Sequence, residues 1–597
     1  MKICEKCKTI PDFLNLLNQG FQQPQALSFK IEGKWVALST AEVLCEIEST
    51  AYSLISLGVK KGDRIAIMGI PCPRWIIADL AIMSIGAISI PLFYNISNDN
   101  FLYEIQNTQP KFIFVIGEDA WKKAEAYPFD DGQVISLEYH GLEYQSVSRS
   151  AMSYNAFLTM GKALKQKEPG AYTDRTSQVK ADDVGKIIYT SGSTGLPKGV
   201  VLLQKGLTAF LGAENFLFSP EDRYINVIPL PHIFGHMTNY AILAYGAKIY
   251  FPDDPKELIS LCPELQPTVI VLVPRLLEKI QGTLWVHAIK QNGLKHRVGL
   301  SALHLASQGK IPWYKKPLQW LADCLIYRKI RNAFGGKVRF VFSSSTTLNP
   351  DLSYFFYNIG MPVLDGYGLT ESPPVSSHFC KTRIKPGTVG PVVKGVNVKI
   401  NPDGEILVKS IAVMKEYYHN PEATSAAFDE EGWFKTGDLG SYDDEKYLVL
   451  NGRKQDLFKS SSGLSVAPSK IEQLLTAAPL VESALVIGEN RRCVVCLLFP
   501  DHDVLAKLKA SNSKYFQSDE EFLNSSMIQR EMQEFIDTLN NKLNKWEKIQ
   551  RYKFINYRLT IKDGDLTPSL KLKRDFLIQK FAKSINMLYE TEESAVN

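Results

Sequence analysis

Length, composition and charge exclude several classes of protein. The chain has 597 residues, which at about 150 residues per domain gives roughly four domain-sized units and excludes a single small module. Hydrophobic residues make up 45% and charged residues 22% of the chain, a globular balance that argues against disordered, collagen-like and solenoid proteins. The formal net charge of +5 is too small to indicate a nucleic-acid partner, and we expect none.

The cysteines favour a reducing, cytoplasmic compartment, because nine in this length are too few for a disulfide scaffold. Two Cys-x-x-Cys pairs, Cys4 with Cys7 and Cys493 with Cys496, leave a four-thiolate zinc site as an alternative. Such a site would have to join opposite ends of the chain, so a buried strand at 493–499 is the favoured interpretation. No apolar run follows residues 1–6, and we therefore expect no secretory signal.

Residues 75–94 form an apolar stretch long enough to span a membrane. It contains one charged residue, Asp79, and is interrupted by Gly86 and Pro91. Because a charge inside hydrocarbon is costly, a buried helix followed by a buried strand is the favoured interpretation.

Short β-branched and aromatic runs alternate with helical segments through the first part of the chain. The runs predict strands at 63–70, 87–93, 111–117, 186–190, 248–251, 268–274 and 338–344. Helical segments separate most of them, which predicts large α/β layers. Between Lys279 and Phe334 a basic, mostly helical stretch with Trp285, Trp313 and Trp320 is predicted to be an elaboration on this core.

The pattern changes at about residue 400. Residues 396–410 predict a β-meander with a Pro-Asp-Gly turn, and 445–453 predict a further strand. After a polar stretch at 454–463 we expect a helix from Pro468, strands at 482–488 and 493–499, two helices and a basic tail segment. These features predict one domain over 1–453 and a second over 454–597, with a hinge near 453–455.

A loop rich in glycine and hydroxyl groups follows the strand that ends at Thr190. Glycines permit close approach of the backbone, while backbone N–H groups, hydroxyls and Lys198 can surround a polyphosphate. Counted from Gly192, Pro197 stands where a Walker A loop needs its second glycine, so the loop is of another type. The predicted nucleotide-binding residues are Thr190, Ser191, Gly192, Ser193, Thr194, Gly195 and Lys198; a plain surface loop is the alternative.

Together with six further segments, this loop resembles the motifs of the adenylate-forming superfamily, which contains acyl-CoA synthetases, peptide-synthetase adenylation domains and firefly luciferase. The seven segments, in family order, are 188–200, 229–235, 274–279, 366–371, 432–439, 452–453 and 567–574. The resemblance covers about residues 30–575. Within the superfamily the chain is most similar to long-chain fatty-acid–CoA ligases, through the elaboration after Lys279 and the segments at 452–472 and 566–574.

The resemblance implies an α/β fold with a large N-terminal domain, made of two layered α/β subdomains and a small β-rich subdomain, and a smaller mobile α+β C-terminal domain. It also implies a two-step reaction. A fatty acid attacks ATP to give acyl-AMP and pyrophosphate, and the thiol of coenzyme A then displaces AMP. The implied ligands are ATP, Mg²⁺, a fatty acid and coenzyme A.

The resemblance implies roles for individual residues around ATP. Thr190 and Glu371 would bind Mg²⁺, which prefers oxygen ligands. Lys571 would bridge the substrate carboxylate and the α-phosphate, where negative charge develops. The other implied contacts are Tyr367 with adenine, Asp365 with its amino edge, Gly368 and Thr370 in the same motif, and Asp438 and Arg453 with the ribose hydroxyls.

His232 and Phe234 resemble the family's aromatic motif near the acyl and pantetheine channels. A structural histidine is the alternative for His232. Ser344, Ser345 and Thr346 replace a Gly-Gly-Ala that is usual in the family, so side chains there could crowd the substrate.

Two other positions depart from the family pattern. Gln455 stands at the hinge position, where Asp or Lys is usual, and Glu416 replaces a common glycine. Two alternatives stay open: transfer of the acyl group to an acyl carrier protein, and an adenylate-binding pseudo-enzyme, which only Ser344, Ser345 and Thr346 suggest. We also expect peripheral contact with the inner face of a membrane through residues 571–583, with an ordinary helix as the alternative.

Overall fold

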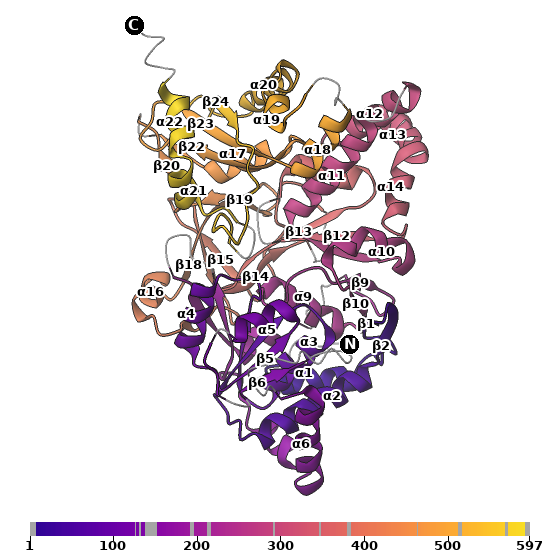
Figure 1. The fold of residues 1–597 in the computed structure, drawn as a ribbon, viewed down its shortest axis with the longest axis vertical. Coiled ribbons are helices and arrows are strands. Elements are labelled where there is room, and N and C mark those ends of the chain that lie inside the picture. Colours follow the sequence, from indigo (N-terminus) through magenta and orange to yellow (C-terminus); the bar gives the residue numbers. More distant parts are fainter. Residues whose placement is uncertain are drawn as a thin grey trace.

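Two mixed β-sheets form most of the N-terminal part (Figure 1). The structure is a computed structural model that describes residues 7–125, 127–130, 133–137, 152–190, 196–209, 211, 217–289, 293–344, 348–378, 384–461, 464–511, 516–567 and 571–590. The first sheet has the spatial order β17 (Glu416–Tyr417), β8 (Lys198–Leu203), β7 (Val184–Thr190), β4 (Ile88–Leu92), β3 (Arg64–Gly69), β5 (Phe112–Ile116) and β6 (Val134–Ser136). The second has the order β14 (Ser372–Ser377), β13 (Val363–Leu369), β12 (Phe340–Ser343), β11 (Val269–Leu272), β9 (Arg223–Ile225), β10 (Lys248–Phe251), β1 (Leu27–Ile31) and β2 (Lys34–Leu38).

Helices cover these sheets, as parallel strands require for their crossover connections. They are α1 (Ile10–Gln19), α2 (Thr40–Ser56), α3 (Pro73–Ser84), α4 (Asn98–Thr108), α5 (Glu118–Glu125), α6 (Tyr154–Lys167), α7 (Ala171–Ser177), α8 (Gln204–Thr208), α9 (Ile233–Ala244), α10 (Leu258–Leu265) and α15 (Pro350–Asn358). One continuous core contains side chains of both sheets together with those of α3 and α9. The two layers therefore fold around a shared interior, and the predicted strands are confirmed.

The apolar stretch at 75–94 forms α3 and β4, as predicted. Asp79 is fully buried, and its Oδ2 lies 2.6 Å from Nζ of Lys186 on β7, which is also fully buried. Tyr240 of α9 and Ser89 of β4 also donate hydrogen bonds to this carboxylate. Among the described residues, no helix is both long enough and apolar enough to cross a membrane.

A smaller β-rich unit follows, formed by β15 (Asn397–Ile400), β16 (Glu405–Lys409), β18 (Phe434–Tyr442) and β19 (Leu448–Arg453), with α16 (Pro421–Ala427) beside it. The predicted meander is β15 and β16, which pair in antiparallel register. The predicted boundary after residue 453 falls at the end of β19, and the boundary itself stays a prediction.

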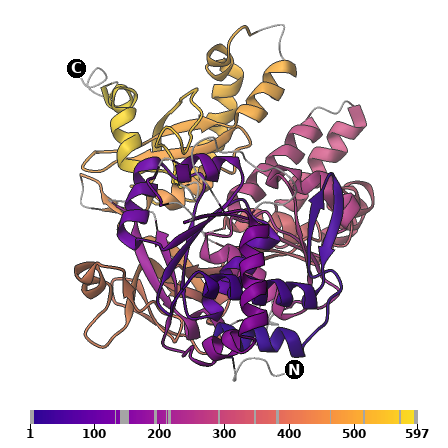
Figure 2. The ribbon, with the colours of Figure 1, turned by 60° about the horizontal axis from the view of Figure 1, so that its bottom comes forward.

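The C-terminal part has a sheet of its own and lies over the N-terminal part (Figures 1 and 2). Its elements are the hairpin β20 (Phe458–Lys459) and β21 (Ser465–Val466), the sheet β22 (Val481–Ile487), β23 (Val494–Pro500) and β24 (Ile549–Phe554), and the helices α17 (Pro468–Leu475), α18 (His502–Ser511), α19 (Asp519–Leu523), α20 (Ser526–Asn540), α21 (Arg574–Lys580) and α22 (Ala582–Glu590). The α/β fold class with a large N-terminal and a smaller α+β C-terminal part is confirmed.

The stretch after Lys279 is helical, as predicted. It comprises α11 (Pro274–Ile289), α12 (Gly293–Ala306), η2 (Trp313–Lys315), α13 (Lys316–Ala322), η3 (Asp323–Tyr327) and α14 (Arg328–Ala333). Helix α11 contacts the C-terminal part through two ion pairs, Arg275 with Glu482 at 2.7 Å and Lys279 with Asp503 at 2.9 Å.

Cys7 and Cys496, one from each predicted pair, lie in separate hydrophobic clusters. Cys7 packs in the N-terminal core and Cys496, on β23, packs in the C-terminal core. Cys4 is outside the described residues. Within the described part of the chain, no group of three or more His, Cys, Asp or Glu residues could hold a metal ion.

Candidate active site

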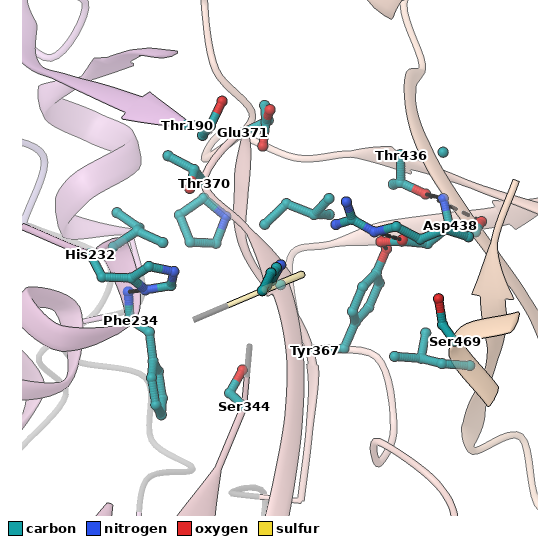
Figure 3. A pocket seen from close by; sticks show the side chains of 18 of the residues that line it. Thr190, His232, Phe234, Ser344, Tyr367, Thr370, Glu371, Thr436, Asp438 and Ser469 are labelled. Atoms are coloured by element: carbon teal, nitrogen blue, oxygen red, sulfur yellow. Dashed lines mark hydrogen bonds and ion pairs between the residues drawn. The ribbon is translucent and has the colours of Figure 1, made fainter. Parts of the chain in front are cut away.

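A cavity of about 2320 Å³ lies where the two sheets, the β-rich unit and the C-terminal part meet (Figure 3). Strands β7, β12 and β13 end at or run into it, and β12 pairs in parallel with β13. The carboxyl ends of parallel strands are the usual place for ligands in such sheets. Most of the described site residues predicted from the sequence line this one cavity.

Asp438 is the centre of a buried polar cluster on one side of the cavity. The hydroxyl of Tyr367 donates a hydrogen bond of 2.8 Å to its Oδ2, and Nε of Arg453 lies 3.1 Å from its Oδ1. Asp438 and Arg453 face each other in the register of β18 and β19, which explains the ion pair. Burial raises the pKa of the Asp438 carboxyl, whereas Arg453 acts to lower it.

Thr190 and Glu371 both line the cavity and are drawn next to each other in Figure 3. Oε1 of Glu371 accepts a 2.9 Å hydrogen bond from the hydroxyl of Tyr417, and Nζ of Lys198 lies 5.1 Å from the Tyr417 ring. A hydroxyl and a carboxylate are oxygen donors of the type that Mg²⁺ takes, with water and phosphate oxygens as its further ligands. The donor set therefore fits a magnesium ion held jointly by protein and phosphate.

Lys571 belongs to the C-terminal part and lines the cavity. Its backbone N–H donates to Oγ1 of Thr567 at 3.1 Å, and its carbonyl oxygen accepts from the Thr567 N–H at 2.8 Å. Burial and the nearby Arg453 guanidinium lower the pKa of Lys571 to about 8, while Asp438 and Glu371 act to raise it. The ammonium group is thus within electrostatic reach of both polar walls.

His232 and Phe234 lie across the cavity from Asp438 (Figure 3). His232 caps α9, since its Nδ1 accepts from the Phe234 N–H at 3.2 Å. The cap depends on Gly235, where a Cβ atom would lie 2.1 Å from the carbonyl oxygen of Pro229. Burial and the charge of Lys571 lower the pKa of His232 to about 4, so the ring is neutral at neutral pH.

An apolar branch of the cavity continues along α9. The Phe234 ring packs on Phe342 of β12, with ring centroids 5.1 Å apart. Further apolar side chains that line the cavity are Phe218, Met237, Ala241 and Leu348. Ser344 follows β12 at this wall and is 8% exposed. The branch offers an aliphatic group a largely non-polar surface.

Some predicted residues lie apart from the cavity or outside the described chain. Asp365 does not line the cavity. Its carboxylate accepts a 3.1 Å hydrogen bond from the Gly366 N–H. Burial raises the pKa of this carboxyl well above its usual range. Gly368, Thr370 and the exposed Gln455 line the cavity. Ser191, Gly192, Ser193, Thr194, Gly195 and Ser345 lie outside the described residues.

Sequence reasoning missed two residues that orient the predicted ones. Tyr417 binds Glu371, and Oγ1 of Thr436 accepts from the Asp438 N–H at 3.0 Å. Thr436 lies two residues before Asp438 in the segment 432–439, and this position in the motif could have identified it as a supporting residue. Tyr417 comes from β17, whose pairing with β8 is not visible in the sequence.

Comparisons with known proteins agree with this geometry. Residues 18–418 match the family model of the AMP-binding enzyme, and residues 455–593 match that of the AMP-binding enzyme C-terminal domain. The chain is 31% identical over 581 residues to the long-chain-fatty-acid–CoA ligase FadD15 of Mycobacterium tuberculosis, covering 94% of each protein.

Solved structures share the fold at lower identity. The A-PCP didomain of carboxylic acid reductase from Segniliparus rugosus, in complex with AMP, has a TM-score of 0.73 at 21% identity, over 98% of this chain and 82% of that one. The anthranilate CoA ligase AuaEII, in complex with anthranoyl-AMP, has a TM-score of 0.71 at 18% identity, over 97% and 98%. With a family model matching most of its length, the chain belongs to the AMP-binding enzyme family.

Proposed function

We propose that the protein is an AMP-forming acid–thiol ligase that activates a long-chain fatty acid with ATP and transfers the acyl group to coenzyme A. The observation that carries this proposal is the composition of one cavity. A polar end holds Asp438, Arg453, Thr190 and Glu371, an apolar branch follows α9, and Lys571 stands between them.

In the first step, a carboxylate oxygen of the fatty acid attacks the α-phosphorus of ATP, an oxygen–phosphorus bond forms, and the bond to pyrophosphate breaks. The Lys571 ammonium binds the carboxylate and the α-phosphate and stabilises the charge that develops between them. Asp438 accepts hydrogen bonds from the ribose hydroxyls, Arg453 holds Asp438 in place, and Tyr367 stacks on adenine. When bound by Thr190 and Glu371, Mg²⁺ supplies positive charge that reduces repulsion between carboxylate and polyphosphate.

In the second step, the sulfur of coenzyme A attacks the acyl carbonyl carbon, a thioester forms, and AMP leaves with the electrons of its bond to the acyl group. AMP is a far better leaving group than the hydroxide of the free acid, which is the reason for the first step. Because Lys571 lines the cavity in this structure, we propose that the C-terminal part rotates about Gln455 to admit the thiol.

The acyl chain extends into the branch along α9, and burial of its methylene groups supplies binding energy. Ser344 lines the cavity at this branch. We propose that it limits the bulk of a substituent next to the carboxyl group and leaves a linear chain unhindered. The proposed substrates are fatty acids, either in solution or taken from a membrane. The proposed location of the protein is the cytoplasm.

Fatty-acid-dependent ATP–pyrophosphate exchange tests the proposal. With a panel of acids of increasing chain length, exchange should be strongest with long chains, and addition of coenzyme A should yield the thioester. Thioester formation only on a holo acyl carrier protein would favour the carrier-protein alternative. A lack of exchange with every acid would favour the adenylate-binding pseudo-enzyme.

A further inference from the structure

The helices after α12 expose an unusual number of aromatic and leucine side chains. Trp313 is 83% exposed and Trp320 is 69% exposed. With four other exposed residues they form what we call the outer helical surface, which consists of Trp313, Tyr314, Leu318, Trp320, Leu321 and Leu325. It belongs to η2, α13 and η3, at the outer rim of the molecule in both ribbon views (Figures 1 and 2).

The fold does not use this surface for its own packing. Leu318, Leu321 and Leu325 are spaced by three and four residues and so share one side of the helix. The opposite side is anchored by Tyr327, which is fully buried and donates a 2.7 Å hydrogen bond to the Ala302 carbonyl oxygen. Exposed apolar patches of this kind in folded proteins mark interaction sites.

The segment that carries the outer helical surface is rich in positive charge. Residues 293–337 contain nine Lys and Arg residues and one acidic residue, Asp323. Asp323 is bound by Arg331 through two hydrogen bonds of 2.5 and 3.0 Å. This segment thus carries a formal excess of eight positive charges, in a chain whose net charge is only +5. This excess of positive charge lies in the same segment as the exposed aromatic rings.

We propose that the outer helical surface docks on an anionic lipid bilayer. Tryptophan and tyrosine rings enter the interface between head groups and acyl chains, leucines insert beside them, and lysine and arginine bind lipid phosphates. An acidic protein would match the charge, but it would not by itself explain six exposed apolar side chains on one short stretch. The bilayer matches both properties.

The C-terminal segment at 571–583 is less suited to the same role. Lys571 faces the cavity, Lys580 lies 2.6 Å from Asp565, and Arg574 is paired with Glu472. Much of its positive charge is therefore neutralised within the protein. Phe576, at 43% exposure, is its large apolar side chain on the surface and provides a comparison.

Vesicle flotation of the full chain, without any substrate, tests the proposal independently of the enzymatic activity. Vesicles of phosphatidylcholine alone are compared with vesicles that also contain phosphatidylglycerol. We expect the parent to bind the anionic vesicles. The Trp313→Ala/Trp320→Ala double variant should lose about tenfold or more in its partition coefficient. In Lys316→Glu and Lys329→Glu, the partition coefficient should fall by about fivefold for each unit of charge that is changed.

Matched variants keep the test specific. Trp546→Ala removes a tryptophan that is 40% exposed in the C-terminal part, and Phe576→Ala removes the comparison residue; both should bind vesicles as the parent does. Each variant should retain its thermal midpoint and its ATP–pyrophosphate exchange with a soluble short-chain acid. The proposal is overturned if the parent binds neither kind of vesicle, or if Phe576→Ala weakens binding as much as the double variant does. It is also overturned if the double variant floats like the parent and the substitutions weaken only binding to another protein.

Discussion

Lys571 is the one predicted ATP-site residue contributed by the C-terminal part, and its role predicts a separation of the two half-reactions. Lys571→Ala should abolish acyl-AMP formation, because no ammonium then stabilises the transferring charge. It should retain thioester formation from supplied acyl-AMP, since that step needs no contact with the α-phosphate during transfer. Single-turnover assays of each step measure this, and an equal loss in both would contradict the assigned role.

The lowered pKa of Lys571 predicts a pH dependence. The pKa is about 8 in the free protein, because burial and Arg453 disfavour the ammonium. The cation is therefore present below pH 8 and is lost above it, and kcat/KM for adenylation should fall as pH rises through about 8. Lys571→Arg is the control, because a guanidinium stays charged over this range. An identical alkaline decline in that variant would show that another group titrates.

The sequence predicted the polar residues of the site better than it predicted their supports. Asp438 and Arg453 belong to motifs, and a motif states residue type and spacing directly. The hydrogen bond from Tyr417 to Glu371 joins strand β17 to the turn between β13 and β14, and local patterns contain no signal for such long-range contacts. The position of Asp365 was also beyond sequence reasoning, since Asp365 lies within β13 and its burial away from the cavity depends on how that strand packs.

At the scale of elements, the buried ion pair between α3 and β7 predicts a large stability effect. Lys186→Met should lower the free energy of unfolding by about 3–5 kcal/mol, because Asp79 is left as an unpaired buried charge. Lys162→Met, which removes an exposed lysine on α6, is the matched control and should cost little. Urea unfolding measures both, and similar values for the two variants would contradict the prediction.

The predicted strands followed from the hydrophobic pattern, and among the strands that were not predicted some were missed for a clear physical reason. Strands such as β3, β5 and β11 are continuous apolar runs buried on both faces, which the sequence displays plainly. Strand β24 was missed, because its sequence IQRYKF alternates charged and apolar residues at the edge of its sheet. The hairpin of β1 and β2 was missed as well, since Lys34 and Trp35 give β2 a mixed pattern.

At the scale of the whole molecule, Glu278 links domain closure to pH. It lies on α11 and hydrogen-bonds Thr476 of the C-terminal part; burial raises its pKa to about 7, against the effects of Thr476 and Arg275. If the C-terminal part rotates away, the carboxyl becomes exposed and its pKa returns toward 4.5. Between pH 4.5 and about pH 7, the Glu278 carboxyl therefore loses its proton in the open form and keeps it in the closed form. Raising pH from about 4.5 to 7 should therefore weaken closure, with no further change above 7 from this group.

Fluorescence energy transfer between labels on the two parts measures closure across this range. Glu278→Gln should flatten the profile, because the amide does not titrate. Glu482→Gln, which weakens the neighbouring pair with Arg275 by removal of a charge, should shift the level of closure and keep the pH dependence. Parallel profiles in the parent and Glu278→Gln would contradict the prediction.

The family could be predicted from the sequence because seven segments occur in one order along the chain. The assembly of the cavity from distant segments could not, since it depends on how the C-terminal part is placed on the two sheets. The ion pairs of α11 with that part are surface contacts between common residue types, and no pattern in the sequence distinguishes them from other charges.

The position of Lys454 has a mechanical consequence. Its backbone N–H donates to the Gly437 carbonyl oxygen at 2.8 Å, and its ammonium lies 2.7 Å from Asp403 and 2.8 Å from Glu405. These contacts fix the residue after Arg453 to the β-rich unit, so a swivel can begin only at Gln455. In the proposed rotation, the pivot lies just beyond Asp438 and Arg453, the pair proposed to bind the ribose. Such a rotation would change the arrangement from the one for acyl-AMP formation to the one for attack by the thiol. The ribose contacts of Asp438 and Arg453 would stay in place.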